Sequence, residues 1–118
     1  MPRTIRVTRR FDFAAGHRAS PTYDGKCKHL HGHTYLLDVT VEGSSTMLNE
    51  HGMLIEFSML KNAVNDWVNR NLDHTTIVHQ NDPIVTDGRT VGIDRFYTMP
   101  DGMTSSAEHL ASHLLDVV

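Results

Sequence analysis

The strongest constraint on the fold of this chain is the alternation of apolar and polar side chains in residues 4–13 and 33–42. Arg9 is the exception in the first segment. A period of two residues is typical of a β-strand that buries one face. We therefore expect two half-buried strands. Their buried faces consist of Ile5, Val7, Phe11, Phe13, Tyr35, Leu37, Val39 and Val41.

Two later segments have the period of an amphipathic helix. Apolar residues at positions 60, 63, 64, 67 and 68 predict a helix that starts at a Ser58 cap and runs to about Leu72. A second helix is predicted from about Ser105, because Ser105 and Glu108 match an S-x-x-E capping box. Its apolar stripe consists of Ala107, Leu110, Ala111 and Leu114.

Residues 75–103, between the two helices, are less regular, and we expect a strand within residues 89–99. Antiparallel strands combined with two amphipathic helices predict an α+β fold in which the helices cover one face of a sheet. The 118 residues suit a single domain spanning residues 1–118. So few strands leave sheet edges exposed, and oligomerisation by edge pairing is a way to cover them.

Composition and charge exclude several classes of function. The net charge of −3 and the isoelectric point near 6.3 give no electrostatic basis for binding nucleic acid or an anionic membrane. No apolar run approaches the roughly 18 residues of a membrane helix, and the N-terminus has no apolar signal-peptide region. The single cysteine cannot form an intramolecular disulfide, so we expect a cytoplasmic protein with a reduced thiol.

A cluster of potential metal ligands connects the two predicted strands. His31 and His33 have the parity of the apolar residues that follow them, so we expect them at the end of the buried face, shielded from bulk water. With His17 they supply three imidazoles, the ligand set of a catalytic zinc with an open fourth position. Cys27, in the loop of residues 18–30, is then an acid/base beside the metal or the fourth ligand of a closed structural site.

Other interpretations of these residues stay open. An H-x-H pair can be ordinary polar residues at the start of a strand. Asp73 and His74 either end the first helix or form a proton relay. Glu108 is explained by the capping box alone. The basic residues of the loop are solvated or receive a phosphorylated substrate: Arg18, Lys26 and Lys28. Surface or structural positions are expected for His29, His51, His79, His109 and His113.

Five motifs occur in the order found in a known protein family. They are Phe-Ala-Ala-Gly-His-Arg at 13–18, Cys-x-x-x-His-Gly-His at 27–33, Gly-Met-Leu-Ile-Glu-Phe at 52–57, Leu-Asp-His at 72–74 and Ser-Ala-Glu-His-Leu-Ala at 106–111. Over nearly its whole length the chain resembles the 6-pyruvoyl-tetrahydropterin synthase family, and within it the 6-carboxy-5,6,7,8-tetrahydropterin synthase branch. The resemblance implies a tunnelling fold (T-fold), in which an antiparallel sheet carries two helices on one side. Subunits of this fold join edge to edge into an oligomeric barrel, typically a homohexamer of two stacked trimers, with active sites at the subunit interfaces.

The resemblance also implies a role for each matching residue. Zn²⁺ would be held by His17, His31 and His33. The catalytic acid/base would be Cys27, with Asp73 and His74 as its partner relay. Ser106 and Glu108 match the segment that helps to bind the pterin. The implied partner is a pterin triphosphate substrate, with no nucleic acid or membrane.

The sequence departs from the family pattern at three places. Glu56 stands where the family has Asp before Phe, and Ser105-Ser106 stands where it has Pro-Thr. Family members also continue past the second helix with two strands, which carry a glutamate that anchors the pterin ring. The sequence ends at Val118 without a match for that glutamate, so we expect a T-fold shortened after the second helix.

The resemblance implies a lyase reaction, in which 7,8-dihydroneopterin triphosphate becomes 6-carboxytetrahydropterin, acetaldehyde and triphosphate. This reaction belongs to the 7-deazaguanine (queuosine) precursor pathway. Three alternatives remain: 6-pyruvoyl-tetrahydropterin synthesis on the same scaffold, a cupin-like metal oxygenase, and an inactive zinc- and pterin-binding oligomer. The two amphipathic helices and the small number of strands argue against the cupin.

Overall fold

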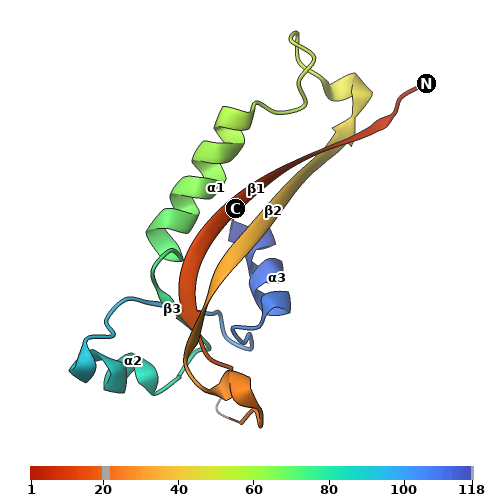
Figure 1. The fold of residues 1–118 in the computed structure, drawn as a ribbon. Helices are drawn as coiled ribbons and strands as arrows, with labels where there is room; N and C mark the ends of the chain where they lie inside the picture. Colours follow the sequence, from red (N-terminus) through yellow and green to blue (C-terminus); the bar gives the residue numbers. More distant parts are fainter. Residues whose placement is uncertain (20–21, 118) are drawn as a thin grey trace.

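A long, curved β-hairpin dominates the computed structural model, which describes residues 1–19 and 22–117 (Figure 1). Strands β1 (Thr4–His17) and β2 (His31–Ser44) have 14 residues each. They pair antiparallel in register from Thr4 opposite Ser44 to His17 opposite His31. Both predicted strands are confirmed, and both extend further than the alternation indicated. Because of these extensions, the paired strands reach His17 and His31.

The sheet has four strands in the order β2-β1-β3-β4, and it is mixed. Strand β3 (Thr76–Val78) runs parallel to the end of β1, and β4 (Phe96–Thr98) runs parallel to β3. The antiparallel prediction is therefore correct for the hairpin and wrong for the other two strand pairs. Strand β4 lies within residues 89–99, as expected, whereas β3 was not predicted. Its three residues are all buried, so they show no alternation.

Both predicted helices are present as α1 (Phe57–Asn71) and α3 (Ala107–Val117), with a short additional helix α2 (Ile84–Asp87). Their caps differ from the prediction. Helix α1 begins after Glu56, so Ser58 lies inside the helix and does not cap it. At α3, the Ser106 hydroxyl accepts a hydrogen bond from the His109 N–H at 3.2 Å. Ser106 is therefore the cap, and the predicted box of Ser105 and Glu108 is wrong by one residue.

The core lies against one face of the hairpin. Phe11, Phe13 and Ala15 of β1 are buried together with side chains of both long helices, which are Leu60, Val64, Val68, Leu110 and Leu114. This confirms the prediction that two helices cover one face of the sheet. Ala63, Ala107 and Ala111 are exposed, so the buried stripe on each helix is narrower than its periodicity indicated.

Arg9 interrupts the apolar pattern of β1 for a structural reason. Its guanidinium donates to the Phe57 carbonyl at 3.1 Å and lies 5.5 Å from the centre of the Phe11 ring. The half-buried side chain thus connects the start of α1 to the sheet. Its charged end satisfies a backbone carbonyl at the start of the helix.

The sheet is not closed into a barrel. β3 pairs with β1 only at Gly16 and His17, so residues 4–13 of β1 have no strand on that side within the described residues. The chain is elongated, with extents of 57 × 26 × 22 Å. None of the described helices combines the length and the apolar character needed to span a membrane. The expected shortening of the fold after Val118 concerns a position outside the described residues.

Candidate metal centre

The three predicted zinc ligands lie together at one end of the hairpin. His17 is the last residue of β1, and it faces His31, the first residue of β2. His33 follows two residues later on the same face of the strand. The potential ligand atoms of the three histidines all lie within 4.8 Å of one another. Their role as metal ligands stays a prediction, but the geometry that this role needs is present.

Hydrogen bonds fix the tautomers of two of these rings. The Ser105 hydroxyl donates its proton to the Arg18 carbonyl at 2.7 Å, so it accepts a hydrogen bond from His17 Nδ1 at 3.0 Å. His31 Nδ1 lies 2.7 Å from the His29 carbonyl, which can only accept. Both Nδ1 atoms therefore carry the proton, and each ring keeps the lone pair of Nε2 for a metal.

The electrostatics at His17 favour its neutral imidazole. Burial lowers the pKa of His17, and the nearby His31 and His33 lower it further. Neutral rings are the form that binds a metal. The described cluster contains three histidines and no carboxylate, a donor set that suits zinc better than calcium or magnesium. The residues present therefore fit the cofactor that the sequence implied.

An open groove borders the histidine cluster at His33. It has a volume of about 540 Å³ and is lined by His33 and His74 together with Ala14, Ala15, Gly16, Gly32, Thr34 and Thr75. His33 is exposed, while His17 and His31 are half-buried. Within the single chain the expected shielding from bulk water is therefore partial at His31 and missing at His33.

Asp73 and His74 form the pair that the sequence suggested. His74 Nδ1 lies 2.9 Å from Asp73 Oδ2, and the other carboxylate oxygen accepts the Ala14 N–H at 3.0 Å. This backbone hydrogen bond, followed by the one from His74, lowers the pKa of Asp73. The carboxylate stays ionised and orients the His74 ring, whose Nε2 remains free. His74 has a φ of 60°, its side chain is 80% exposed, and it lines the groove.

Cys27 belongs neither to the histidine cluster nor to the lining of the groove in the single chain. It sits in a short 3₁₀ turn, Lys26–Lys28, where its carbonyl accepts the Ala19 N–H at 2.7 Å. The residue is exposed, and its thiol does not belong to the histidine cluster among the described residues. This arrangement argues against a closed site of one cysteine and three histidines.

Arg18 is paired with Asp82 within the chain. Its guanidinium donates to both carboxylate oxygens of Asp82, at 2.8 Å from Nε to Oδ2. The Asp82 side chain is only 1% exposed and also accepts the Ile84 N–H at 2.9 Å. Arg18 is therefore half-buried and paired rather than solvated, whereas Lys26 and Lys28 are exposed as expected. Binding of a phosphorylated substrate by these basic residues stays a prediction. Nothing in the sequence pattern identified Asp82 as the partner of Arg18.

The two residues matched to pterin binding lie at the start of α3. Ser106 caps the helix, and Glu108 is exposed in its first turn. Ser105, directly before them, contacts the metal cluster through His17. The structure thus connects this segment with the candidate metal centre. The contact of Ser105 with His17 was not predicted, because the sequence pattern already explained Ser105 as a helix cap.

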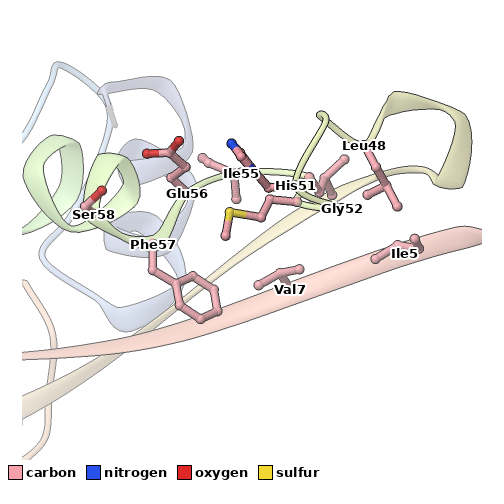
Figure 2. Close-up of a pocket in the computed structure, with 11 residues that line it drawn as sticks. Ile5, Val7, Leu48, His51, Gly52, Ile55, Glu56, Phe57 and Ser58 are labelled. Carbon is pink, nitrogen blue, oxygen red and sulfur yellow. The ribbon is translucent and has the colours of Figure 1, made fainter.

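A second hollow lies at the opposite end of the hairpin (Figure 2). It has a volume of about 490 Å³, and Ile5 and Val7 line it opposite the segment that leads into α1. Along β1, Ile5 and His17 are roughly 40 Å apart. Glu56 and His51 are the ionisable residues of its lining. This hollow is therefore separate from the histidine centre, and its walls are mostly apolar.

The fold and the site together define an α+β protein with a cluster of three histidines that could hold a metal ion at the end of a hairpin. The family model described as 6-pyruvoyl tetrahydropterin synthase matches residues 6–118. The chain belongs to this family, whose members are lyases, and the resemblance found in the sequence is confirmed.

Two relatives are both named 6-carboxy-5,6,7,8-tetrahydropterin synthase. The protein from Rickettsia typhi is 38% identical, in an alignment that covers 93% of this chain and 77% of that protein. The protein from Aquifex aeolicus is 34% identical, with 93% and 76% covered.

Solved structures support the T-fold. An uncharacterised protein from Wolinella succinogenes has a TM-score of 0.75 at 21% identity, covering 96% of this chain and 82% of the other. The 6-pyruvoyl tetrahydropterin synthase of Plasmodium falciparum has a TM-score of 0.67 at 24% identity, with 96% and 76% covered. At these identities the similarity concerns the fold alone.

Proposed function

We propose that the protein is a zinc-dependent 6-carboxy-5,6,7,8-tetrahydropterin synthase, which converts 7,8-dihydroneopterin triphosphate to 6-carboxytetrahydropterin, acetaldehyde and triphosphate. One observation carries this proposal: the imidazoles of His17, His31 and His33 come together at one end of the hairpin, and His33 lines the same groove as His74, which is paired with Asp73. The names of the relatives from Rickettsia typhi and Aquifex aeolicus support the choice of reaction.

The histidines His17, His31 and His33 would hold the metal through ring nitrogens. When bound, zinc would act as a Lewis acid that acidifies the hydroxyl groups of the substrate side chain. Asp73 holds the His74 ring by its Nδ1–H, so that Nε2 is free to accept or return a proton at the groove. Ser106 and Glu108, beside the centre at the start of α3, would bind the pterin.

Cys27 is the proposed acid/base for the opposite proton transfers. To act in this way it would have to be brought to the histidine cluster by assembly with another subunit. Its thiol lies outside the groove of the single chain. We therefore place the complete active site at an interface between subunits of a homohexamer or trimer. The exposed His33 and the open edge of β1 support an assembly of this kind. A pterin triphosphate substrate and the single reduced thiol agree with a cytoplasmic enzyme.

The alternative reaction, 6-pyruvoyl-tetrahydropterin synthesis, differs in keeping the two carbons that the first reaction releases. Zinc-loaded protein should be incubated with 7,8-dihydroneopterin triphosphate under reducing conditions, with products identified by mass spectrometry and acetaldehyde assayed in the same tube. Carboxytetrahydropterin with acetaldehyde supports the proposal, and a pyruvoyl product without acetaldehyde supports the alternative. Unchanged substrate in the presence of bound zinc would indicate an inactive binding protein.

The role of Cys27 has its own test. Cys27→Ala is expected to keep the zinc of the wild type and to lose about 10²–10⁴-fold in turnover, the usual contribution of a positioned acid/base. Zinc content should be measured by elemental analysis of the same sample. Loss of zinc in this variant would instead identify Cys27 as a metal ligand.

A further inference from the structure

Ser105 lies between the histidine cluster and the main chain of the loop that follows β1. Its hydroxyl donates to the Arg18 carbonyl at 2.7 Å and lies 3.0 Å from His17 Nδ1. The residue is 2% exposed, so water cannot readily replace either contact. It approaches His17 from a segment 88 positions away in the sequence. This contact therefore depends on the tertiary fold and does not arise from local chain geometry.

We propose that Ser105 is a positioning residue for the metal centre, which holds His17 in the tautomer and orientation that direct Nε2 toward His31 and His33. The inference rests on the proposed zinc site and adds to it a residue outside the ligand set. A metal-binding histidine commonly donates its second N–H to a fixed acceptor, which sets the ring orientation and raises its basicity.

The direction of the hydrogen bond is the essential step. A hydroxyl can donate or accept, so Ser105 would select a tautomer only if its own proton were already used. The Arg18 carbonyl takes that proton, and the Arg18 side chain is held in turn by the buried Asp82 carboxylate. The ion pair of its side chain thus holds Arg18, whose carbonyl accepts the Ser105 proton, in place. The lone pair of the Ser105 hydroxyl is then left to face His17.

His31 provides an internal comparison. Its Nδ1–H is directed at the His29 carbonyl, a backbone group that no substitution removes. His17 has a side-chain acceptor at the corresponding place, so its orientation can be tested by mutation. Proline, which stands at this position in the family pattern, has no hydroxyl, so the hydrogen bond is a feature of this chain and not of that pattern.

The test compares Ser105→Ala, Ser105→Thr and Ser105→Val with the wild type. Zinc affinity of the metal-free proteins should be measured by competition with a chromophoric chelator, after circular dichroism has confirmed folding. Ser105→Ala is expected to bind zinc 10–100-fold more weakly, the usual loss when such a partner of a ligand is removed. Thr keeps the hydroxyl and should bind more tightly than the nearly isosteric Val, a comparison that stands if the alanine variant does not fold.

Two further measurements separate positioning from a general loss of structure. Ser112→Ala removes an exposed hydroxyl of α3 and should leave zinc affinity within about threefold of the wild type, since it removes no partner of a ligand. Long-range ¹H–¹⁵N NMR of the metal-free protein should show His17 as the Nδ1–H tautomer in the wild type and as a mixture in Ser105→Ala.

Equal zinc affinity in the wild type, Ser105→Ala and Ser105→Val, or an unchanged His17 tautomer, would overturn the positioning role and leave the proposed function intact. A wild-type protein that binds no zinc would overturn the proposed function instead. In that case the tautomer measurement still decides whether Ser105 orients His17.

Discussion

Asp73 joins the backbone of β1 to the candidate acid/base His74 through its two carboxylate oxygens. Asp73→Asn is expected to leave zinc content unchanged and to reduce turnover by about 10²-fold or more, because the amide no longer holds a neutral Nδ1–H ring in one orientation. Steady-state kinetics on zinc-loaded protein measure the change. Asp66→Asn, an exposed carboxylate on α1, is the matched control and should have wild-type turnover. Wild-type turnover in Asp73→Asn would remove the pair from the mechanism.

The ion pair of Arg18 and Asp82 makes stability depend on pH in a defined direction. Burial opposes ionisation of Asp82, but the hydrogen bonds from Arg18 and the Ile84 N–H outweigh it and lower the pKa of this carboxyl from its ordinary value of 3.8. The unfolded chain then binds the proton more readily than the folded one. The pair therefore stabilises the fold fully above pH 3.8, and this stabilisation is lost as the pH falls through the lower folded pKa.

Asp82→Asn tests this linkage. Near neutral pH the free energy of unfolding of the variant should be about 3 kcal/mol lower than that of the wild type. The reason is that the partly buried guanidinium of Arg18 loses the carboxylate with which it pairs. The difference should shrink as the pH falls below 3.8. Urea unfolding of both proteins at a series of pH values measures it. A difference that is constant with pH would mean that the carboxylate charge contributes nothing.

At the scale of the secondary-structure elements, the start of α3 offers a test of which residue is the cap. Ser106→Ala should destabilise the protein by about 1 kcal/mol, the usual cost of removing a serine cap. Glu108→Ala should change stability by less than about 0.5 kcal/mol, as exposed substitutions do. Thermal or urea unfolding measures both. A large effect at Glu108 would restore the capping box that the sequence suggested.

The sequence predicted well those elements whose pattern of apolar residues repeats over many positions. The hairpin and the two long helices each bury one face, so their residues alternate or recur over ten or more positions. The short parallel strands β3 and β4 have only three residues each and depend on distant partners. Their pairing with the end of β1 is a tertiary property that no local pattern contains.

The candidate site divides in the same way. Spacing along the chain indicated His17, His31, His33, Asp73 and His74, and the structure places all five around one end of β1. The residues that brace them come from segments without a motif: Ser105 contacts His17, and Asp82 holds Arg18. Such contacts follow from tertiary packing, and for Ser105 a simpler local explanation as a helix cap concealed the role.

For the molecule as a whole, size and shape point to association with other chains. Its radius of gyration is 17.5 Å, whereas a compact chain of this length would have about 13.5 Å. Its accessible surface is 7847 Å², whereas a monomer of this mass would have about 6,450 Å². The open edge of β1 and the exposed His33 are parts of this excess surface. A chain that buried them against other subunits would also shield the histidine cluster.

We therefore expect a molar mass that is a multiple of 13.3 kDa, the mass of one chain. Light scattering after size exclusion at several concentrations measures it. Hydrogen exchange adds the location: amides of residues 4–13 that face the open edge should be protected in the assembly, because strand pairing gives them hydrogen-bond partners. A monomer at every concentration, with rapid exchange along that edge, would contradict the assembly. An oligomer with an unprotected edge would instead place the subunit contacts on another surface, such as the apolar hollow at Ile5 and Val7.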